Sequence, residues 1–281
     1  MEKQTKRKNE RQLKIALAQT AICWEAKEQN YQIAQKWVQD AVMQGAEAVF
    51  FPEMSFTGFS MNTDATKEGD ERTISCMRAL ARQYHVRIGF GWVKDCMAEC
   101  GKCENHYTVV DSEGTVCSDY AKIHPFSYAG EDAKFQGGSA LAQFALNGIP
   151  CGSVICYDLR FPELFQVISD KAHLIVVAAN WPAKRSAHWK ALLQARAIEN
   201  QVYLLAVNCV GSIGGVQYTG DSCVIDPDGV VRASLSASEG MIYYELTDDA
   251  ERYRKAFPVK QDRQRTLYAS LEAQAMEKVE K

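Results

Sequence analysis

The 281-residue sequence lacks several features that mark whole classes of protein. It has no apolar run long enough to cross a membrane, no internal repeat, no low-complexity tract and no linker. Its net charge is −3, so there is no excess of basic residues for nucleic-acid binding. We therefore expect no membrane or nucleic-acid partner, and a single domain over residues 13–281.

The first residues also lack the apolar segment of a secretory signal. Residues 1–12 are polar and basic, which predicts a disordered tail. The ten cysteines do not resemble a secreted disulfide scaffold, which would be shorter and richer in loops. We therefore expect a cytoplasmic protein whose thiols act mainly as small core residues.

Apolar segments alternate with segments of helical period along most of the chain. Buried strands are predicted at residues 48–52, 151–156, 174–179 and 203–208, and helices at 28–44, 73–84, 162–171 and 187–200. Hairpins are predicted within 106–121 and 224–231. Helices between apolar strands indicate an α/β fold, and the hairpins add antiparallel strands to it.

Cys156 lies where an apolar strand meets a polar break, and a helix that starts with Pro162 follows. A thiol at such a strand-to-helix elbow is exposed at the edge of a sheet, beside backbone N–H groups that can bind an oxyanion. A cysteine in an apolar strand is also commonly a buried structural residue. From this segment alone, both interpretations remain open.

Two further polar residues end predicted strands. Glu53 follows the buried run 48–52, and Lys122 follows the strand 115–121. Each one alone is more often a solvated strand end than a catalytic group. Together with Cys156, they supply a base, an electrophile and a nucleophile.

The segments around these three residues resemble the nitrilase, or carbon–nitrogen hydrolase, superfamily. The matching motifs are Phe51-Pro52-Glu53, the Tyr-Ala-Lys-Ile-His run that contains Lys122, and the run from Cys156 to Glu163, and the resemblance extends from about residue 14 to about residue 264. It implies a four-layer α-β-β-α sandwich, a Glu53–Lys122–Cys156 triad, no metal or cofactor, and a homodimer.

The family also carries a second glutamate between the lysine and the cysteine. Its position matches Glu131, although Asp132 is adjacent. Segments 180–189, 192–201 and 253–258 resemble the bacterial omega-amidase branch. That resemblance implies hydrolysis of 2-oxoglutaramate or 2-oxosuccinamate to the acid and ammonia through a cysteine thioester. Another linear amide, an N-carbamoyl compound or a nitrile is the alternative substrate.

A 2-oxo acid amide carries a carboxylate, so its site needs a cation away from the scissile amide. Arg160 is the first candidate, because it follows Cys156 by four residues and a guanidinium binds carboxylates bidentately. The alternative for Arg160 is a structural ion pair with Glu163 or Asp158.

Lys184 and Arg185 are further candidates, because they fall in a loop after a predicted strand. Their alternative is a solvated loop. Trp181 is predicted to line the pocket, and the backbone N–H of Tyr157 is predicted to help Lys122 bind the oxyanion.

The segment from Cys96 to His106 contains three cysteines and a histidine within eleven residues. It could ligate zinc or serve a redox function. It also lies between predicted strands, at the tip of a hairpin. We expect a solvent-facing loop there, without a metal.

Overall fold

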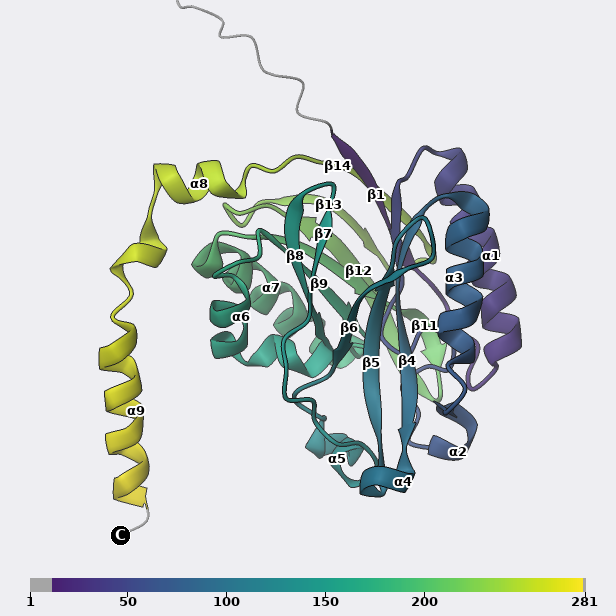
Figure 1. Ribbon diagram of the computed structural model, residues 1–281, viewed down its shortest axis with the longest axis horizontal. Helices are drawn as coiled ribbons and strands as arrows, with labels where there is room; N and C mark the ends of the chain where they lie inside the picture. Colours follow the sequence, from purple (N-terminus) through teal and green to yellow (C-terminus); the bar gives the residue numbers. More distant parts are fainter. Residues whose placement is uncertain (1–11, 280–281) are drawn as a thin grey trace, which may run out of the picture.

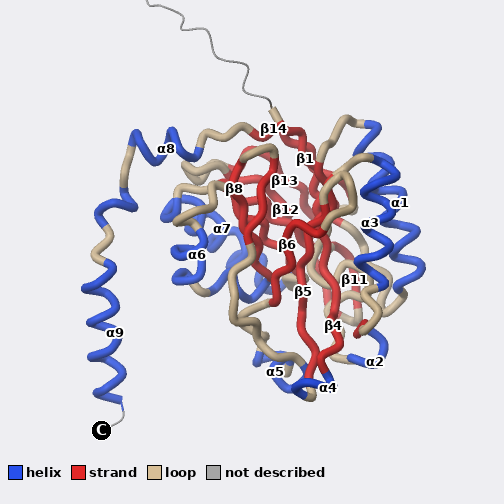
Figure 2. Tube along the Cα trace, viewed as in Figure 1, coloured by secondary structure: helices blue, strands red, loops and turns tan. Residues whose placement is uncertain are grey.

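The computed structural model describes residues 12–279, and the side chains of residues 12–276. Apart from Gln12, the predicted basic tail lies outside the described residues. Two β-sheets lie face to face (Figure 2), and a pair of helices covers the outer side of each sheet (Figure 1). This arrangement confirms the predicted α-β-β-α sandwich.

The first sheet has the strand order β14-β1-β2-β4-β5-β6, with β3 paired to β4. Its central pairs β1/β2 and β2/β4 are parallel. The strands are β1 (Leu13–Gln19), β2 (Ala48–Phe50), β3 (Lys67–Glu68), β4 (Arg87–Cys96), β5 (Lys102–Val110), β6 (Val116–Ala121) and β14 (Gly240–Leu246).

The second sheet has the order β11-β12-β10-β9-β8-β7, with β13 paired to β12. Its central pairs β8/β9 and β9/β10 are also parallel. The strands are β7 (Gln143–Leu146), β8 (Ile149–Ile155), β9 (Leu174–Ala179), β10 (Tyr203–Asn208), β11 (Val210–Ile213), β12 (Val216–Ile225) and β13 (Val231–Ser236).

Helices α1 (Lys27–Met43) and α3 (Arg72–Tyr84) cover the first sheet, and α6 (Pro162–Ile168) and α7 (Ser186–Asn200) cover the second (Figure 1). In the described part of the chain, no helix has the length and apolarity needed to cross a membrane. The remaining helices are α2 (Thr63–Thr66), α4 (Met97–Cys100), α5 (Glu131–Lys134), α8 (Ala250–Ala256) and α9 (Arg265–Val279).

Three apolar layers hold this sandwich together. Phe50 and Tyr107 from the first sheet meet Ile155 and Leu205 from the second sheet between the two. Separate clusters pack α1 and α3 onto the first sheet, and α6 and α7 onto the second. Full burial of a large apolar side chain contributes about 1.5–3 kcal/mol, so these layers supply most of the stabilisation.

The strands and helices predicted from apolar runs agree with the structure to within a few residues. Strands β2, β8, β9 and β10 and helices α1, α3, α6 and α7 are confirmed. Strands β7, β11 and β14 and the C-terminal helices α8 and α9 were not predicted. Strand β14 pairs antiparallel with β1, although the two lie at opposite ends of the chain.

The hairpin formed by β4 and β5 is longer than predicted. Its strands reach Cys96 and start again at Lys102, so the tip is reduced to α4 and Gly101. Cys96 and Cys103 are buried, and Cys103 packs against Met54 and Phe135. The expectation of a solvent-facing loop is therefore wrong for these two cysteines and holds for the exposed Cys100.

The sandwich brings several strand ends to one edge. Because β6 is antiparallel to β5, which is itself antiparallel to β4, β6 runs in the same direction as β2. Glu53 therefore follows β2, and Lys122 follows β6, at the same edge of the first sheet. Cys156 follows β8 in the sheet that faces it.

Gly91 in β4 lets the Glu53 segment pack closely against the strand. A Cβ atom at this position would lie 2.3 Å from the Met54 nitrogen and 2.8 Å from the Glu53 carbonyl carbon. Two hydrogen bonds fix the contact, from the Ser55 N–H to the Gly91 carbonyl (3.0 Å) and from the Gly91 N–H to the Ser55 Oγ (2.9 Å). A side chain at Gly91 therefore has no room, because the backbone of the Glu53 segment fills the space and cannot rotate away.

We predict that Gly91→Ala lowers the free energy of unfolding by about 1–3 kcal/mol, because overpacked sites must shift their backbone. Urea denaturation followed by circular dichroism measures the change. Gly69→Ala is the matched control, because nothing lies within 4 Å of a Cβ atom built at Gly69. Equal unfolding midpoints for the two variants would contradict the close approach.

Candidate active site

Cys156 lies at a sharp turn between β8 and the 3₁₀ turn Cys156–Arg160, and α6 begins at Pro162. Its φ angle of 45° is in the left-handed region, which non-glycine residues rarely adopt. Such backbone strain clusters at functional sites, where the surrounding structure maintains it. The predicted strand-to-helix elbow at Cys156 is therefore confirmed.

Asp158 holds this elbow to the strand that carries Lys122. Its buried carboxylate accepts hydrogen bonds from the Ile155 N–H (3.0 Å) and the Tyr120 hydroxyl (2.8 Å). The backbone N–H of His124 (3.1 Å) and the His124 Nδ1 (2.8 Å) contact its other oxygen. Asp158 therefore fixes the turn at Cys156 relative to the end of β6.

Glu53 is fully buried and contacts three donors. Its Oε1 accepts from Lys122 Nζ at 2.9 Å and from Asn105 Nδ2 at 2.8 Å. Its Oε2 accepts from the backbone N–H of Asn180, which follows β9, at 2.8 Å. The second sheet therefore helps to position a carboxylate that belongs to the first.

Lys122 bridges two buried carboxylates. Its Nζ lies 2.9 Å from Glu53 Oε1, and 3.0 and 2.8 Å from the two oxygens of Glu131. Burial alone would lower the pKa of Lys122, but the charges of Glu131 and Glu53 outweigh burial and raise that pKa above its usual value. The second glutamate beside Lys122 is therefore Glu131, and the adjacent Asp132 is exposed.

The thiol of Cys156 is neutral in this environment. Burial raises its pKa well above the ordinary value, and the Glu53 charge raises it further. Lys122 and the Asn180 backbone N–H act in the opposite direction. A thiol of this kind becomes a nucleophile when a neighbouring base accepts its proton.

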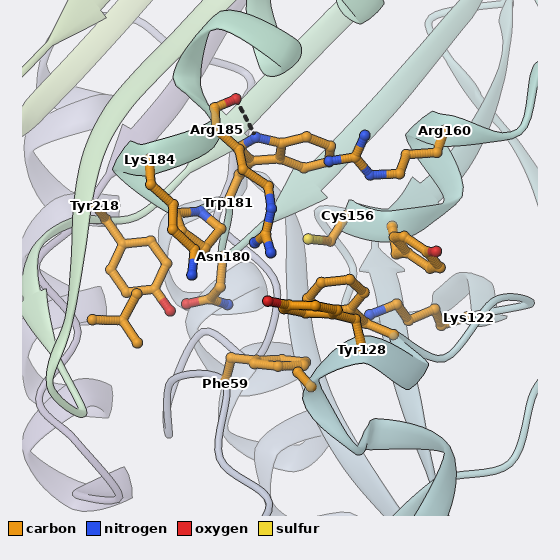
Figure 3. Close-up of a pocket in the computed structure, with 15 residues that line it drawn as sticks. Phe59, Lys122, Tyr128, Cys156, Arg160, Asn180, Trp181, Lys184, Arg185 and Tyr218 are labelled. Carbon is orange, nitrogen blue, oxygen red and sulfur yellow. Dashed lines mark hydrogen bonds between the residues drawn. The ribbon is translucent and has the colours of Figure 1, made fainter.

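A cavity of about 170 Å³ opens above Cys156 and Lys122 (Figure 3). Six aromatic and four cationic residues contribute to its lining. The aromatic residues that line the cavity are Phe59, Phe126, Tyr128, Tyr157, Trp181 and Tyr218.

Arg160, Lys184 and Arg185 all line this cavity (Figure 3). The Arg160 guanidinium stacks on Trp181 at 4.8 Å and contacts His188 Nδ1 at 3.5 Å. It forms no ion pair with Glu163 or Asp158, so the structural alternative for Arg160 is wrong.

Arg185 stacks 5.3 Å above the rings of both Phe126 and Tyr128. Lys184 is exposed at the cavity rim, and Trp181 donates from its indole nitrogen to the Arg185 carbonyl at 2.8 Å. Among the described side chains, no carboxylate pairs with Arg160, Lys184 or Arg185. The cavity therefore combines an aromatic wall with unneutralised positive charge.

Asn105 and Asn180 were not predicted as site residues, although both contact Glu53. Asn105 lies on β5, in a stretch that was assigned to a loop. Asn180 directly follows a predicted apolar strand, as Glu53 and Cys156 do. That shared position at a strand end could have identified Asn180 as a candidate site residue.

The cluster from Cys96 to His106 has the side-chain arrangement of a packed strand pair. The His106 ring nitrogens contact Asp119 (2.9 Å) and Glu104 (3.0 Å), and Cys96 Sγ contacts Glu104 at 3.4 Å. Among the described side chains of residues 12–276, no three His, Cys, Asp or Glu form a group that could hold a metal ion. Nothing in this arrangement supports the zinc or redox interpretation.

Comparison with known proteins agrees with this geometry. Residues 14–255 match the carbon–nitrogen hydrolase family. The sequence is 37% identical over 253 residues to the omega-amidase YafV of Escherichia coli, covering 89% of this chain and 96% of that protein. It is 34% identical over 227 residues to the 2-oxoglutaramate amidase of Bacillus subtilis, covering 79% and 87% of the two chains.

Among solved structures, the fold is similar to XC1258 from Xanthomonas campestris, described as a CN-hydrolase superfamily protein with an arsenic adduct in the active site. The TM-score is 0.82 at 27% identity, and the match covers 90% of this chain and 97% of the other. The fold, the match over residues 14–255 and these relatives show that the chain belongs to the carbon–nitrogen hydrolase family.

Proposed function

We propose that the protein hydrolyses the terminal amide of a small 2-oxo acid amide, 2-oxoglutaramate or 2-oxosuccinamate, to the acid and ammonia. The observation that carries this proposal is a buried Glu53–Lys122 pair beside Cys156, under a cavity whose three other lining cations pair with no carboxylate among the described side chains. Such a cavity suits a small substrate with an amide at one end and a carboxylate at the other. The names of the two amidase relatives support the same substrate class.

In the proposed mechanism, Glu53 accepts the proton of the Cys156 thiol while the sulfur attacks the amide carbon. The Lys122 ammonium and the Tyr157 backbone N–H stabilise the resulting oxyanion. When the C–N bond breaks, protonated Glu53 gives its proton to the departing nitrogen, and ammonia leaves. A thioester on Cys156 remains.

Water completes the reaction in the same site. Glu53 accepts a proton from water as the water oxygen attacks the thioester carbon. Collapse of this second intermediate breaks the C–S bond, and Glu53 returns the proton to Cys156. Glu131 keeps Lys122 charged and oriented, because it contacts Nζ through both carboxylate oxygens.

For the substrate carboxylate, the geometry favours Arg185 over Arg160, which the sequence analysis placed first. Arg185 lies over two neighbouring aromatic rings of the cavity, whereas Arg160 lies along Trp181 and turns one nitrogen toward His188. In Figure 3 the Arg185 side chain points into the cavity and the Arg160 side chain runs beside the Trp181 ring. Lys184 adds positive charge at the rim.

The alternative within the family is a different linear amide, an N-carbamoyl compound or a nitrile. Measuring ammonia release from a panel that includes 2-oxoglutaramate, an uncharged amide and a nitrile separates these substrates. The proposal requires 2-oxoglutaramate or 2-oxosuccinamate to be the best substrate of the panel. A clear preference for the nitrile or the N-carbamoyl compound would contradict it.

We also propose a homodimer in the cytoplasm. Large apolar side chains are exposed on α6, α7 and α9, where a second copy would bury them: Val167 (58%), Ile198 (54%), Leu267 (52%) and Leu271 (52%). All ten cysteines are free, which suits a reducing compartment.

Cys156→Ala is expected to abolish amide hydrolysis and leave the fold intact, because no other nucleophile serves the proposed mechanism. Cys156→Ser is expected to be nearly as inactive, since a hydroxyl ionises far less readily than a thiol. Ammonia release, with circular dichroism to verify folding, measures both effects. Cys223→Ala is the control, because that buried thiol lies on β12 outside the cavity. Substantial turnover by Cys156→Ala would contradict a covalent mechanism.

Replacing the carboxylate-binding cation is expected to reduce selectivity more than general activity. A charge-assisted hydrogen bond contributes about 1.5–3 kcal/mol, or about ten- to a hundred-fold in kcat/KM. Arg185→Met should therefore lower kcat/KM for 2-oxoglutaramate by that factor and leave an uncharged amide of similar length nearly unaffected.

Arg160→Met and Lys184→Met are the comparison variants for this experiment. We expect a smaller loss of selectivity from each of them than from Arg185→Met. If all three variants keep the selectivity of the unmodified protein, either the carboxylate is bound elsewhere or the proposed substrate class is wrong.

Light scattering at micromolar concentration is expected to give twice the chain mass. Val167→Glu combined with Ile198→Glu should convert the dimer to a monomer, because each change places a charge in the proposed apolar interface. Val230→Glu is the control, since it alters an exposed apolar residue in the turn before β13. A monomeric unmodified protein would contradict the proposal.

A further inference from the structure

Asn105 joins the two carboxylates that contact Lys122. Its Nδ2 donates to Glu53 Oε1 at 2.8 Å and to Glu131 Oε1 at 3.1 Å. The side chain is 1% exposed and reaches the site from β5, between the end of β2 and α5. One amide nitrogen therefore uses both of its hydrogens on two separate buried acids.

The charge balance shows why this donor matters. Glu53 and Glu131 bring two negative charges, and Lys122 brings one positive charge. Two buried carboxylates repel each other, which disfavours ionisation of the pair. The Asn105 amide offsets part of this repulsion without adding a charge, because a hydrogen bond to the ionised form favours that form.

The orientation of the Asn105 amide is fixed by its partners. Turning it over would place the amide oxygen against two carboxylate oxygens, which accept hydrogen bonds and cannot donate them when ionised. In the observed orientation, Oδ1 is buried without a hydrogen-bond partner. An unpaired buried acceptor is unfavourable, so packing alone does not account for an asparagine at this position.

We propose that Asn105 is a positioning residue that holds Glu53 and Glu131 in their ionised form and in place, so that Glu53 can accept the Cys156 proton. This inference rests on the proposed role of Glu53 as the base. The family motifs supply Glu53, Lys122 and Cys156. Asn105 adds to them a neutral hydrogen-bond donor from β5.

Other titratable groups face Glu53 from the surrounding elements. They are Lys122 after β6, Glu131 in α5, Cys156 after β8, Cys209 after β10 and Tyr218 in β12. Burial raises the pKa of Cys209 and of Tyr218 well above their ordinary values, so neither loses its proton near neutral pH. Neither group therefore contributes to the acid side of a pH profile.

Alkylation by iodoacetamide tests this inference without reference to the natural substrate. The Cys156 sulfur forms a bond to the reagent carbon, iodide leaves, and Glu53 accepts the thiol proton before passing it to solvent. The rate of Cys156 modification, measured by peptide mass spectrometry across pH, should therefore fall on the acid side as the carboxylate pair becomes protonated. The exposed Cys100 provides an internal reference in each sample.

In Asn105→Leu, which keeps the side-chain volume and removes the donor, we expect the acid midpoint of Cys156 alkylation to rise by about one pH unit. A charge-assisted hydrogen bond changes an ionisation equilibrium by about tenfold or more, and tenfold corresponds to one pH unit. The acid midpoint of Cys156 alkylation should also rise in Asn105→Ser. If Asn105→Leu does not fold, the result for Asn105→Ser tests the inference. For a variant that folds, kcat/KM for amide hydrolysis should fall about ten- to a hundred-fold.

Ser118→Ala is the matched control. Ser118 is also buried with an unpaired side-chain oxygen, and it lies on the neighbouring strand β6 without a contact to either carboxylate. In Ser118→Ala, the acid midpoint of Cys156 alkylation should not change. A folded Asn105 variant with an unshifted midpoint would overturn the inference. A shifted midpoint in a protein that releases no ammonia from any amide would instead overturn the proposed function alone.

Discussion

The buried contact of Lys122 with Glu53 and Glu131 is the constraint on which the rest of the site depends. Two carboxylates and an ammonium group lie essentially out of reach of solvent, with Nζ–O distances of 2.8 to 3.0 Å. Removing one partner from a buried pair typically costs about 3–5 kcal/mol, because the charge left behind is uncompensated. These three residues come from separate elements, so the cluster requires β2, β6 and α5 to be correctly packed.

Cys156 is held to this cluster by a third buried acid. Asp158 accepts hydrogen bonds from the elbow and from Tyr120 and His124, which flank Lys122 in the chain. The strained φ of Cys156 is maintained by those contacts. The facing sheet contributes Asn180, whose backbone N–H contacts Glu53. Glu53 and Cys156 are thus fixed relative to each other by backbone as well as by side chains.

Sequence patterns predicted those parts of the fold and site that depend on residues close together in the chain. Apolar runs located β2, β8 and β9 and made Glu53 and Cys156 candidates at their ends, and the family motifs then joined these two residues with Lys122. The pairing of β14 with β1 could not be predicted, because contacts between the two ends of a chain leave no local pattern. Asn105 was missed because its segment, between two predicted strands, was assigned to the tip of a hairpin, whereas packing of Cys103 against Phe135 extends the strand past it. Whether Arg160 forms an ion pair could not be predicted either, because this depends on tertiary packing.

The central claim is that this charge cluster converts a neutral, buried thiol into a nucleophile that carries the acyl group. Trapping the intermediate tests it most directly. The protein is mixed with 2-oxoglutaramate, quenched with acid during the first turnover, digested and mapped by mass spectrometry. The account predicts an acyl group on the Cys156 peptide that disappears at longer times as the free acid accumulates. Product formation with no acyl group on Cys156 at any time, under conditions that preserve thioesters, would contradict it.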